Sequence, residues 1–309
     1  MKYLILQTIL IIAASITAQQ SIDLPHNYDN QFINNAGATA LHGGTEVSGY
    51  YNRSFNNVDN APTTFMAGLQ YELPGQSASI GGYLISEKAS LLSQNTIAGT
   101  FAYKLRGIGE GYISMGIGMN LSMYSFDGND ALVIHQADPN LGNNESGMGI
   151  NFQAGAVYST AEKVGGRNGS PIMVQLGVGA ARLNRGINIK SLYQYNEEML
   201  ITGFASLLYS QGKELVFRAF VESQYEAFSQ LNLNLGGRAV INETFLAGAS
   251  IDNDLNLGVQ LGIMLATAGS DAMSTLAFNF NLPMGDIVSY TNPGIGITLH
   301  HQIETASGW

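Results

Sequence analysis

Large apolar residues occupy every second position through long stretches of this chain. From Ile113 to Met123 the odd positions are all large and apolar, and the even positions between them are Ser, Gly or Asn. Residues 255–265 and 274–283 show the same period of two. This period predicts β-strands with one apolar face and one small or polar face. In a soluble sandwich the apolar faces would meet in a protein core, whereas in a membrane barrel they would face lipid around a polar lumen.

The pattern predicts about fourteen strands, most of them long enough for a tilted crossing of the bilayer, which takes about 9–11 residues. After the first 18 residues, no window approaches 18 uninterrupted apolar residues, so a helical membrane protein is not expected. We therefore predict an all-β fold, a transmembrane antiparallel up-and-down β-barrel over residues 43–309. The expected strands are 43–53, 62–72, 78–88, 94–106, 111–124, 147–159, 172–181, 197–209, 214–225, 229–241, 244–253, 255–265, 274–283 and 293–304.

The first 18 residues resemble a cleaved signal peptide, and this feature favours the barrel. Lys2 supplies the positive start, residues 3–14 are mostly apolar, and Ala18 precedes the expected cut at Gln19. The signal peptide would direct the chain out of the cytoplasm, and the barrel would place it in the outer membrane, surrounded by outer-membrane lipid. Residues 19–42 come before the first strand and are expected to form a periplasmic segment or a plug.

Composition narrows the possible functions. The chain has no cysteine, which excludes disulfides and cysteine-based metal sites. Charged residues make up 12% of the chain, about half of the usual share and too few for a soluble surface. The net charge of −10 disfavours a nucleic-acid partner. A soluble exported β-sandwich remains the structural alternative, and it would be extracted without detergent.

Loop lengths predict the orientation of the barrel. An even number of strands places both termini in the periplasm, with short turns there and longer loops outside. The links at 74–77, 107–109, 210–213 and 242–243 would be periplasmic. The longest connection, Ser125–Ser146, would lie outside, as would Arg182–Asn196. The link Thr160–Pro171 is long yet periplasmic in this count, which indicates either a strand miscount or a real periplasmic loop.

The predicted lumen face consists mostly of Gly, Ser, Asn, Gln and Thr. Its few charges include Lys104, Arg218, Glu222 and Arg238. A diffusion porin lines its constriction with more charge than this. The small residues would leave either an open neutral pore or room for a plug made by residues 19–42.

No catalytic, cofactor or metal site is predicted. His300 and His301 are neighbours on a strand, so they point to opposite faces and cannot share one metal ion; one would lie in the lumen and the other at the membrane interface. The acidic turns at 127–130 and 252–254 lack the spacing of a calcium loop. We expect a protein that is not an enzyme.

Two segments carry a family resemblance. Residues 31–37 read Gln-Phe-Ile-Asn-Asn-Ala-Gly, and residues 60–65 read Asn-Ala-Pro-Thr-Thr-Phe and run into an alternating strand. This arrangement resembles the PorP/SprF family of type IX secretion system membrane proteins, whose members carry a segment similar to N-P-L-x-I-N-P-A-x-A-G after the signal peptide and A-P-T-T at the second strand. The chain departs from the pattern at Asn35, where members usually have Pro, and at Ala38, near which members have an aromatic residue.

The resemblance implies a non-enzymatic outer-membrane barrel of the type IX secretion and gliding machinery. Such a barrel would support export or surface anchoring of a large secreted adhesin, or would link the periplasmic ring to the outer membrane. The candidate partner-binding residues are Asn34, Asn35, Ala36, Gly37, Ala61, Pro62, Thr63 and Thr64. The alternative function is an outer-membrane channel for a neutral or hydrophobic small solute.

Overall fold

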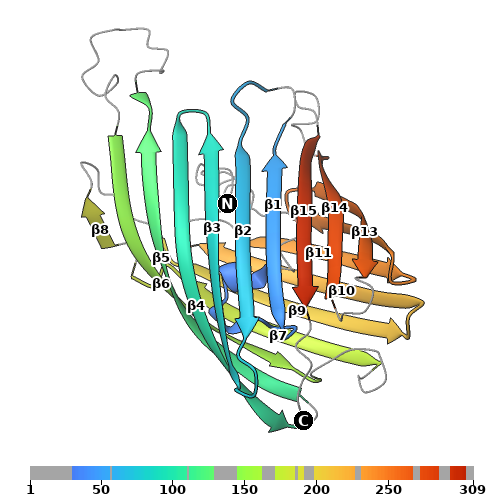
Figure 1. The fold of residues 1–309 in the computed structure, drawn as a ribbon. Helices are drawn as coiled ribbons and strands as arrows, with labels where there is room; N and C mark the ends of the chain where they lie inside the picture. The colour runs from blue at the N-terminus through green and yellow to red at the C-terminus, as the bar shows by residue number, and fades with distance from the viewer. Residues whose placement is uncertain are drawn as a thin grey trace, which may run out of the picture.

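The computed structural model describes residues 30–55, 58–109, 111–128, 145–161, 171–184, 187–190, 198–226, 231–266, 272–284 and 293–303. Fourteen long strands form one antiparallel sheet that closes on itself (Figure 1). They are β1 (Thr45–Arg53), β2 (Thr63–Glu72), β3 (Ala78–Ala89), β4 (Leu92–Ile108), β5 (Gly111–Phe126), β6 (Glu145–Ser159), β7 (Ile172–Ala181), β9 (Leu200–Gln211), β10 (Leu215–Glu226), β11 (Asn232–Ile241), β12 (Phe245–Asp252), β13 (Asn256–Ala266), β14 (Ala272–Pro283) and β15 (Gly294–Ile303).

The sheet closes without a free edge among these fourteen strands. The first and last strands pair in register from Thr45 opposite Ile303 to Arg53 opposite Ile295. The pairing of β5 with β6, which begins with Tyr112 opposite Ser159, completes the ring. Closure satisfies the backbone hydrogen bonds within the wall, as a lipid environment requires. The predicted barrel and its strand number are confirmed.

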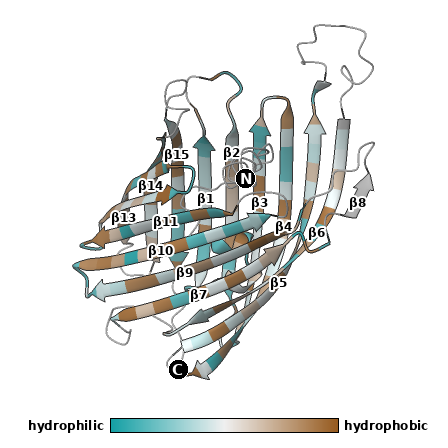
Figure 2. Ribbon diagram, turned by 180° about the vertical axis from the view of Figure 1, so that it is seen from behind, coloured by the Kyte–Doolittle hydropathy of each residue, from teal (hydrophilic) through white to brown (hydrophobic). Residues whose placement is uncertain are grey.

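The two-residue alternation sorts the side chains between the two faces of this wall. Ile117, Leu235 and Phe245 are outward and 60–65% exposed. Gln153 and Gln260, on the lumen side, are 2% and 1% exposed. Figure 2 shows the resulting alternation of hydrophobic and hydrophilic residues along the strands. The outer surface is therefore apolar, and most of the buried polar side chains of the wall face the lumen, as in a membrane barrel.

The two ends of the barrel differ in the length of their links. One end carries the short links 73–77, 109–110, 212–214 and 242–244. The other end carries two short links, 90–91 and 253–255, together with the two longest links of the chain, 127–144 and 182–199. Short turns mark the periplasmic end of such a barrel. Exposed Tyr103, Tyr209 and Phe217 lie near that end on the outer surface, as expected for an aromatic belt at the membrane boundary. Because the count of fourteen holds, a miscount does not explain the long link Thr160–Pro171, most of which lies outside the described residues.

One short strand is not predicted by the alternating pattern. The segment Arg182–Asn196 was predicted to be a loop, but it contains β8 (Ile187–Lys190), which pairs with β6 beside Met148–Ile150. Four residues are too few for an alternating pattern to be distinguished from a loop. The strand lies at the long-loop end and is not part of the closed ring.

Residues 30–44 lie inside the barrel before β1 begins. They form two single-turn 3₁₀ helices, η2 (Gln31–Ile33) and η3 (Ala36–Ala38). Neither these turns nor any other helix in the described part of the chain is long and apolar enough to span a membrane. Their side chains contribute to the main hydrophobic core, which consists of Phe32, Ile33, Ala38 and Leu41 packed with Tyr50, Met66, Tyr83, Ile85, Ala98, Tyr112 and Val157. The barrel core is thus built around its own N-terminal segment.

Candidate functional site: a plugged lumen

The segment 30–44, called the plug from here on, is almost completely buried. Phe32 is 1% exposed, and Ala36 and Ala40 are fully buried. The Phe32 ring meets the Tyr83 ring of β3 edge to face, with 5.5 Å between centroids. Such pairs add about 0.5–1.5 kcal/mol beyond the burial of their surface. The plug is therefore packed against the wall like a core element.

Glycines in three neighbouring strands make room for η3. A Cβ atom at Gly116 of β5 would lie 2.2 Å from the Ala36 carbonyl oxygen. At Gly155 of β6 it would lie 1.9 Å from the Asn35 Oδ1, and at Gly179 of β7 it would lie 2.7 Å from the Asn34 carbonyl oxygen. No residue with a side chain fits these distances. These three lumen glycines, the glycine bay, let the plug backbone approach the backbone of the wall.

The wall also supplies hydrogen-bond donors to the plug carbonyls. The Tyr83 hydroxyl donates to Ile33 at 3.1 Å, and the Tyr112 hydroxyl donates to Leu41 at 2.8 Å. Lys104 Nζ donates to Ala40 at 2.6 Å. Because a short irregular segment cannot satisfy its own backbone, these bonds remove a cost that burial would otherwise impose. They fix the conformation and depth of the plug.

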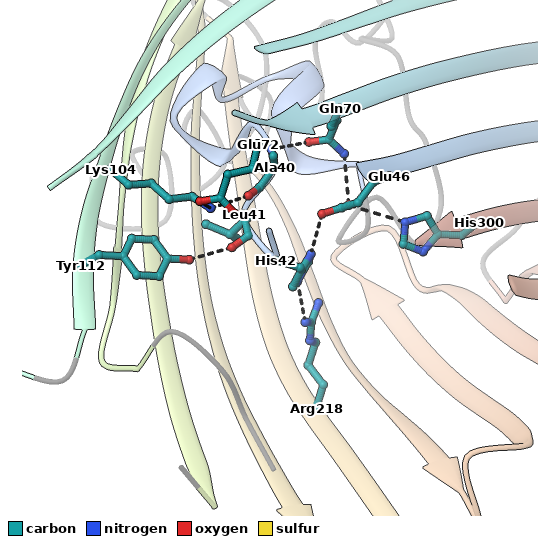
Figure 3. Close-up of polar contacts among 10 residues, drawn as sticks. All are labelled: Ala40, Leu41, His42, Glu46, Gln70, Glu72, Lys104, Tyr112, Arg218 and His300. Atoms are coloured by element: carbon teal, nitrogen blue, oxygen red, sulfur yellow. Dashed lines mark hydrogen bonds and ion pairs between the residues drawn. The ribbon is translucent and has the colours of Figure 1, made fainter. Parts of the chain in front are cut away.

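A polar network joins the end of the plug to both sides of the wall near the periplasmic end (Figure 3). On one side the Ala40 amide donates to Gln70 Oε1 at 2.8 Å, and Gln70 Nε2 donates to Glu46 Oε2 at 3.3 Å. On the other side Arg218 Nη2 lies 3.1 Å from His42 Nε2. His42 Nδ1 in turn lies 3.6 Å from Glu46 Oε1. The network thus spans the lumen from β2 to β10.

Glu46 is the central charge of this network. Its side chain is 1% exposed and has His300 Nε2 at 3.5 Å in addition to His42 and Gln70. A buried carboxylate is tolerated only where donors surround it, because its desolvation costs several kcal/mol. Lys104 forms a second pair, with Glu72 at 3.3 Å, and Arg106 also contacts Glu72. Plug and wall are therefore held by charge-assisted contacts as well as by packing.

The predicted partner-binding residues fall in two separate places. Asn34, Asn35, Ala36 and Gly37 belong to the plug, where Asn35 caps η3 by accepting a hydrogen bond from Gly37 N at 3.0 Å and donates to Ala156 O at 3.4 Å. The other four, Ala61 to Thr64, lie at the long-loop end of the wall, where Ser54 N donates to Pro62 O. The structure does not bring the two groups together. Partner binding by either group stays a prediction.

Three of the four predicted lumen charges, Lys104, Arg218 and Glu222, contact the plug or lie beside it. Lys104 and Arg218 bind the plug directly, at Ala40 and His42. Glu222 accepts a hydrogen bond from Asn234 at 3.3 Å and lies beside Asn34 and Asn35. Arg238 is directly opposite Arg218 in the register of β10 and β11.

Sequence reasoning missed the residues that complete the network, namely His42, Glu46, Gln70 and Glu72. Glu46 lies on the lumen face by parity, so its place in the alternation was a usable signal. Its pairing with His300 depends on closure between β1 and β15, which no local pattern reveals. The opposite orientation of the two histidines is confirmed: His301 contacts Ser274 at 2.8 Å, away from Glu46. Among the described residues no cluster could hold a metal ion.

These observations define a class of protein: an outer-membrane β-barrel with its lumen occupied by its own N-terminal segment. The chain belongs to the PorP/SprF family of type IX secretion system membrane proteins, whose family model matches residues 16–301. The search of curated proteins found no match.

Solved structures with a similar fold are outer-membrane channels. The monoaromatic hydrocarbon channel CymD has a TM-score of 0.52 at 10% identity, covering 92% of this chain and 95% of that one. The P. putida toluene transporter TodX has a TM-score of 0.50 at 8% identity, covering 88% and 92%. At such low identity the likeness concerns the barrel fold alone.

Proposed function

We propose that this barrel acts without catalysis as a binding partner in type IX secretion, supporting export or surface anchoring of a secreted adhesin-like protein. The observation that carries the proposal is the plug. A lumen crossed by buried residues tied to both sides of the wall is suited to rigidity, not to solute passage. A rigid barrel offers binding surface at its two ends. Linking the periplasmic ring to the outer membrane is the related role that the family also suggests.

The first test is genetic. Deleting the gene should abolish surface display of one exported protein, detected by labelling intact cells, and should leave the uptake of small solutes unchanged. Re-expression of the parent chain should restore display. Unchanged display of all exported proteins in the deletion strain would contradict the proposal.

The alternative, a channel for a neutral or hydrophobic solute, has one supporting observation, a recess between the plug and the wall beside β9 and β10. Planar-bilayer recordings with the purified protein separate the two functions. We expect no steady conductance from the parent barrel, because the plug fills the lumen. A steady single-channel conductance would favour transport.

A further inference from the structure

The plug runs through the lumen from the exterior half of the barrel down to the periplasmic end. Near its start, the Asn34 carbonyl accepts a hydrogen bond at 3.3 Å from Thr202, which is the third residue of β9 counted from the exterior end of that strand. Near its end, the Leu41 carbonyl accepts from Tyr112, the second residue of β5 counted from the periplasmic end (Figure 3). The described chain therefore starts on the exterior side and reaches the periplasm only where β1 begins.

The described residues leave no free path from the start of the plug back to the periplasm. On one side η3 packs against β4, β5, β6 and β7. Toward β9 and β10 the recess beside the plug has about 20 Å³ of free space, which holds roughly one water molecule. Toward β12, β13 and β14 the lumen-facing side chains of Leu246, Gln260 and Asn279 are all buried. The segment that precedes Asn30 thus has an open way only toward the cell exterior.

The composition of that segment also favours water over the lumen. Residues 19–29 include two Asp and no Lys or Arg. Glu222 and Glu226 of β10 already bring carboxylates to the exterior half of the lumen, and the Arg182 guanidinium there is paired with Glu226 at 2.7 Å. Burying two further carboxylates beside them would be costly, because each would lose its hydration without gaining a cation.

We propose that residues 19–29 leave the lumen through its exterior mouth and form an arm at the cell surface. An extended chain spans about 3.3–3.6 Å per residue, so this segment reaches roughly 36–40 Å. Gln31 borders Gln224, and β10 continues for only two residues beyond it, so the reach is sufficient. Strand parity predicts both termini in the periplasm, but the direction of the plug reverses this for the N-terminus. The arm lies on the side where the proposed partner is displayed, although its path does not depend on the proposed function.

Single cysteines test this path, because the chain has none of its own. Ser21→Cys marks the arm, Asp254→Cys marks the exterior link 253–255, and Lys213→Cys marks the periplasmic link 212–214. Asp254 and Lys213 are both exposed. Intact cells that make each full-length variant are treated with a maleimide on a polyethylene glycol chain too large to cross the outer membrane, and a gel shift reports the reaction. All three variants should show the heat-modifiable gel mobility of a folded barrel.

We expect the shifted fraction of Ser21→Cys to be the same in intact and in permeabilised cells, as for Asp254→Cys. Lys213→Cys should shift only after permeabilisation. Ser21→Cys that reacts only after permeabilisation would lie in the periplasm, and Ser21→Cys that reacts only after denaturation would lie inside the lumen; either result overturns the inference. Exchanged behaviour of the two controls would reverse the barrel in the membrane and overturn it as well. Because this readout needs no partner, unchanged display after gene deletion would contradict the proposed function alone.

Discussion

Gly116→Leu should open the barrel. The new Cβ would lie 2.2 Å from the Ala36 carbonyl oxygen and 2.7 Å from the Gly37 nitrogen, and neither backbone atom can move without moving η3. Overpacking of this kind costs about 1–3 kcal/mol, occasionally more. At about 3 kcal/mol the population with a displaced plug would rise roughly 100-fold. We expect conductance events in planar bilayers where the parent barrel is silent, and faster proteolysis of the released N-terminal segment.

The matched control is Gly99→Leu. Gly99 lies on the neighbouring strand β4, faces outward and has no atom within 4 Å of the position that a Cβ would take. It should remain silent and protease-resistant. If Gly116→Leu folds and behaves like Gly99→Leu, the plug does not occupy the glycine bay. Should Gly116→Leu fail to fold, a variant that lacks residues 30–41 takes its place. This deletion removes the plug outright, so the folded variant should also conduct in planar bilayers.

Lys104→Met should have the largest effect among the charged positions. The ammonium group is buried and serves both the Ala40 carbonyl at 2.6 Å and Glu72 at 3.3 Å. Its removal leaves the buried Ala40 carbonyl without its donor. It also removes one of the cations beside the Glu72 carboxylate, whose side chain is 14% exposed. Arg106 still contacts Glu72, so we expect a loss of about 2–3 kcal/mol in the free energy of unfolding. Urea titration of the barrel in lipid vesicles measures this loss.

Lys213→Met controls for the removal of a positive charge. Lys213 pairs with Glu243 at 3.4 Å, but its side chain is 86% exposed and lies in the link between β9 and β10. Exposed pairs contribute little because water and salt screen them. The unfolding midpoint should therefore stay at the parent value. Equal losses for the two variants would mean that Lys104 does not bind the plug.

Local pattern was sufficient to predict the wall. Alternation identified all fourteen ring strands because each strand has lipid on one side and the lumen on the other, so its pattern depends only on its own residues. Strand β8 has only four residues, too few to show this alternation. Its pairing with Met148–Ile150 joins two segments that are distant in the sequence, and no local pattern reveals it.

The plug and its network could be predicted only in part. Residues 30–44 have no regular period, and their burial depends on glycines at positions 116, 155 and 179, more than 70 residues away. Those glycines look like ordinary small lumen residues in the sequence. His42, in the plug, lies four residues before Glu46 at the start of β1, but their partners Arg218 and His300 come from strands that only closure of the ring brings near.

Spin labels on single cysteines test the central claim most directly, since the chain has no cysteine of its own. Labels at Ile117 and Leu235 should be readily relaxed by oxygen dissolved in the bilayer, because both side chains point into lipid. A label replacing Gln260 should be protected from oxygen by the filled lumen. The opposite result, with immobile and oxygen-inaccessible labels at positions 117 and 235, would place those side chains in a protein core and contradict the barrel.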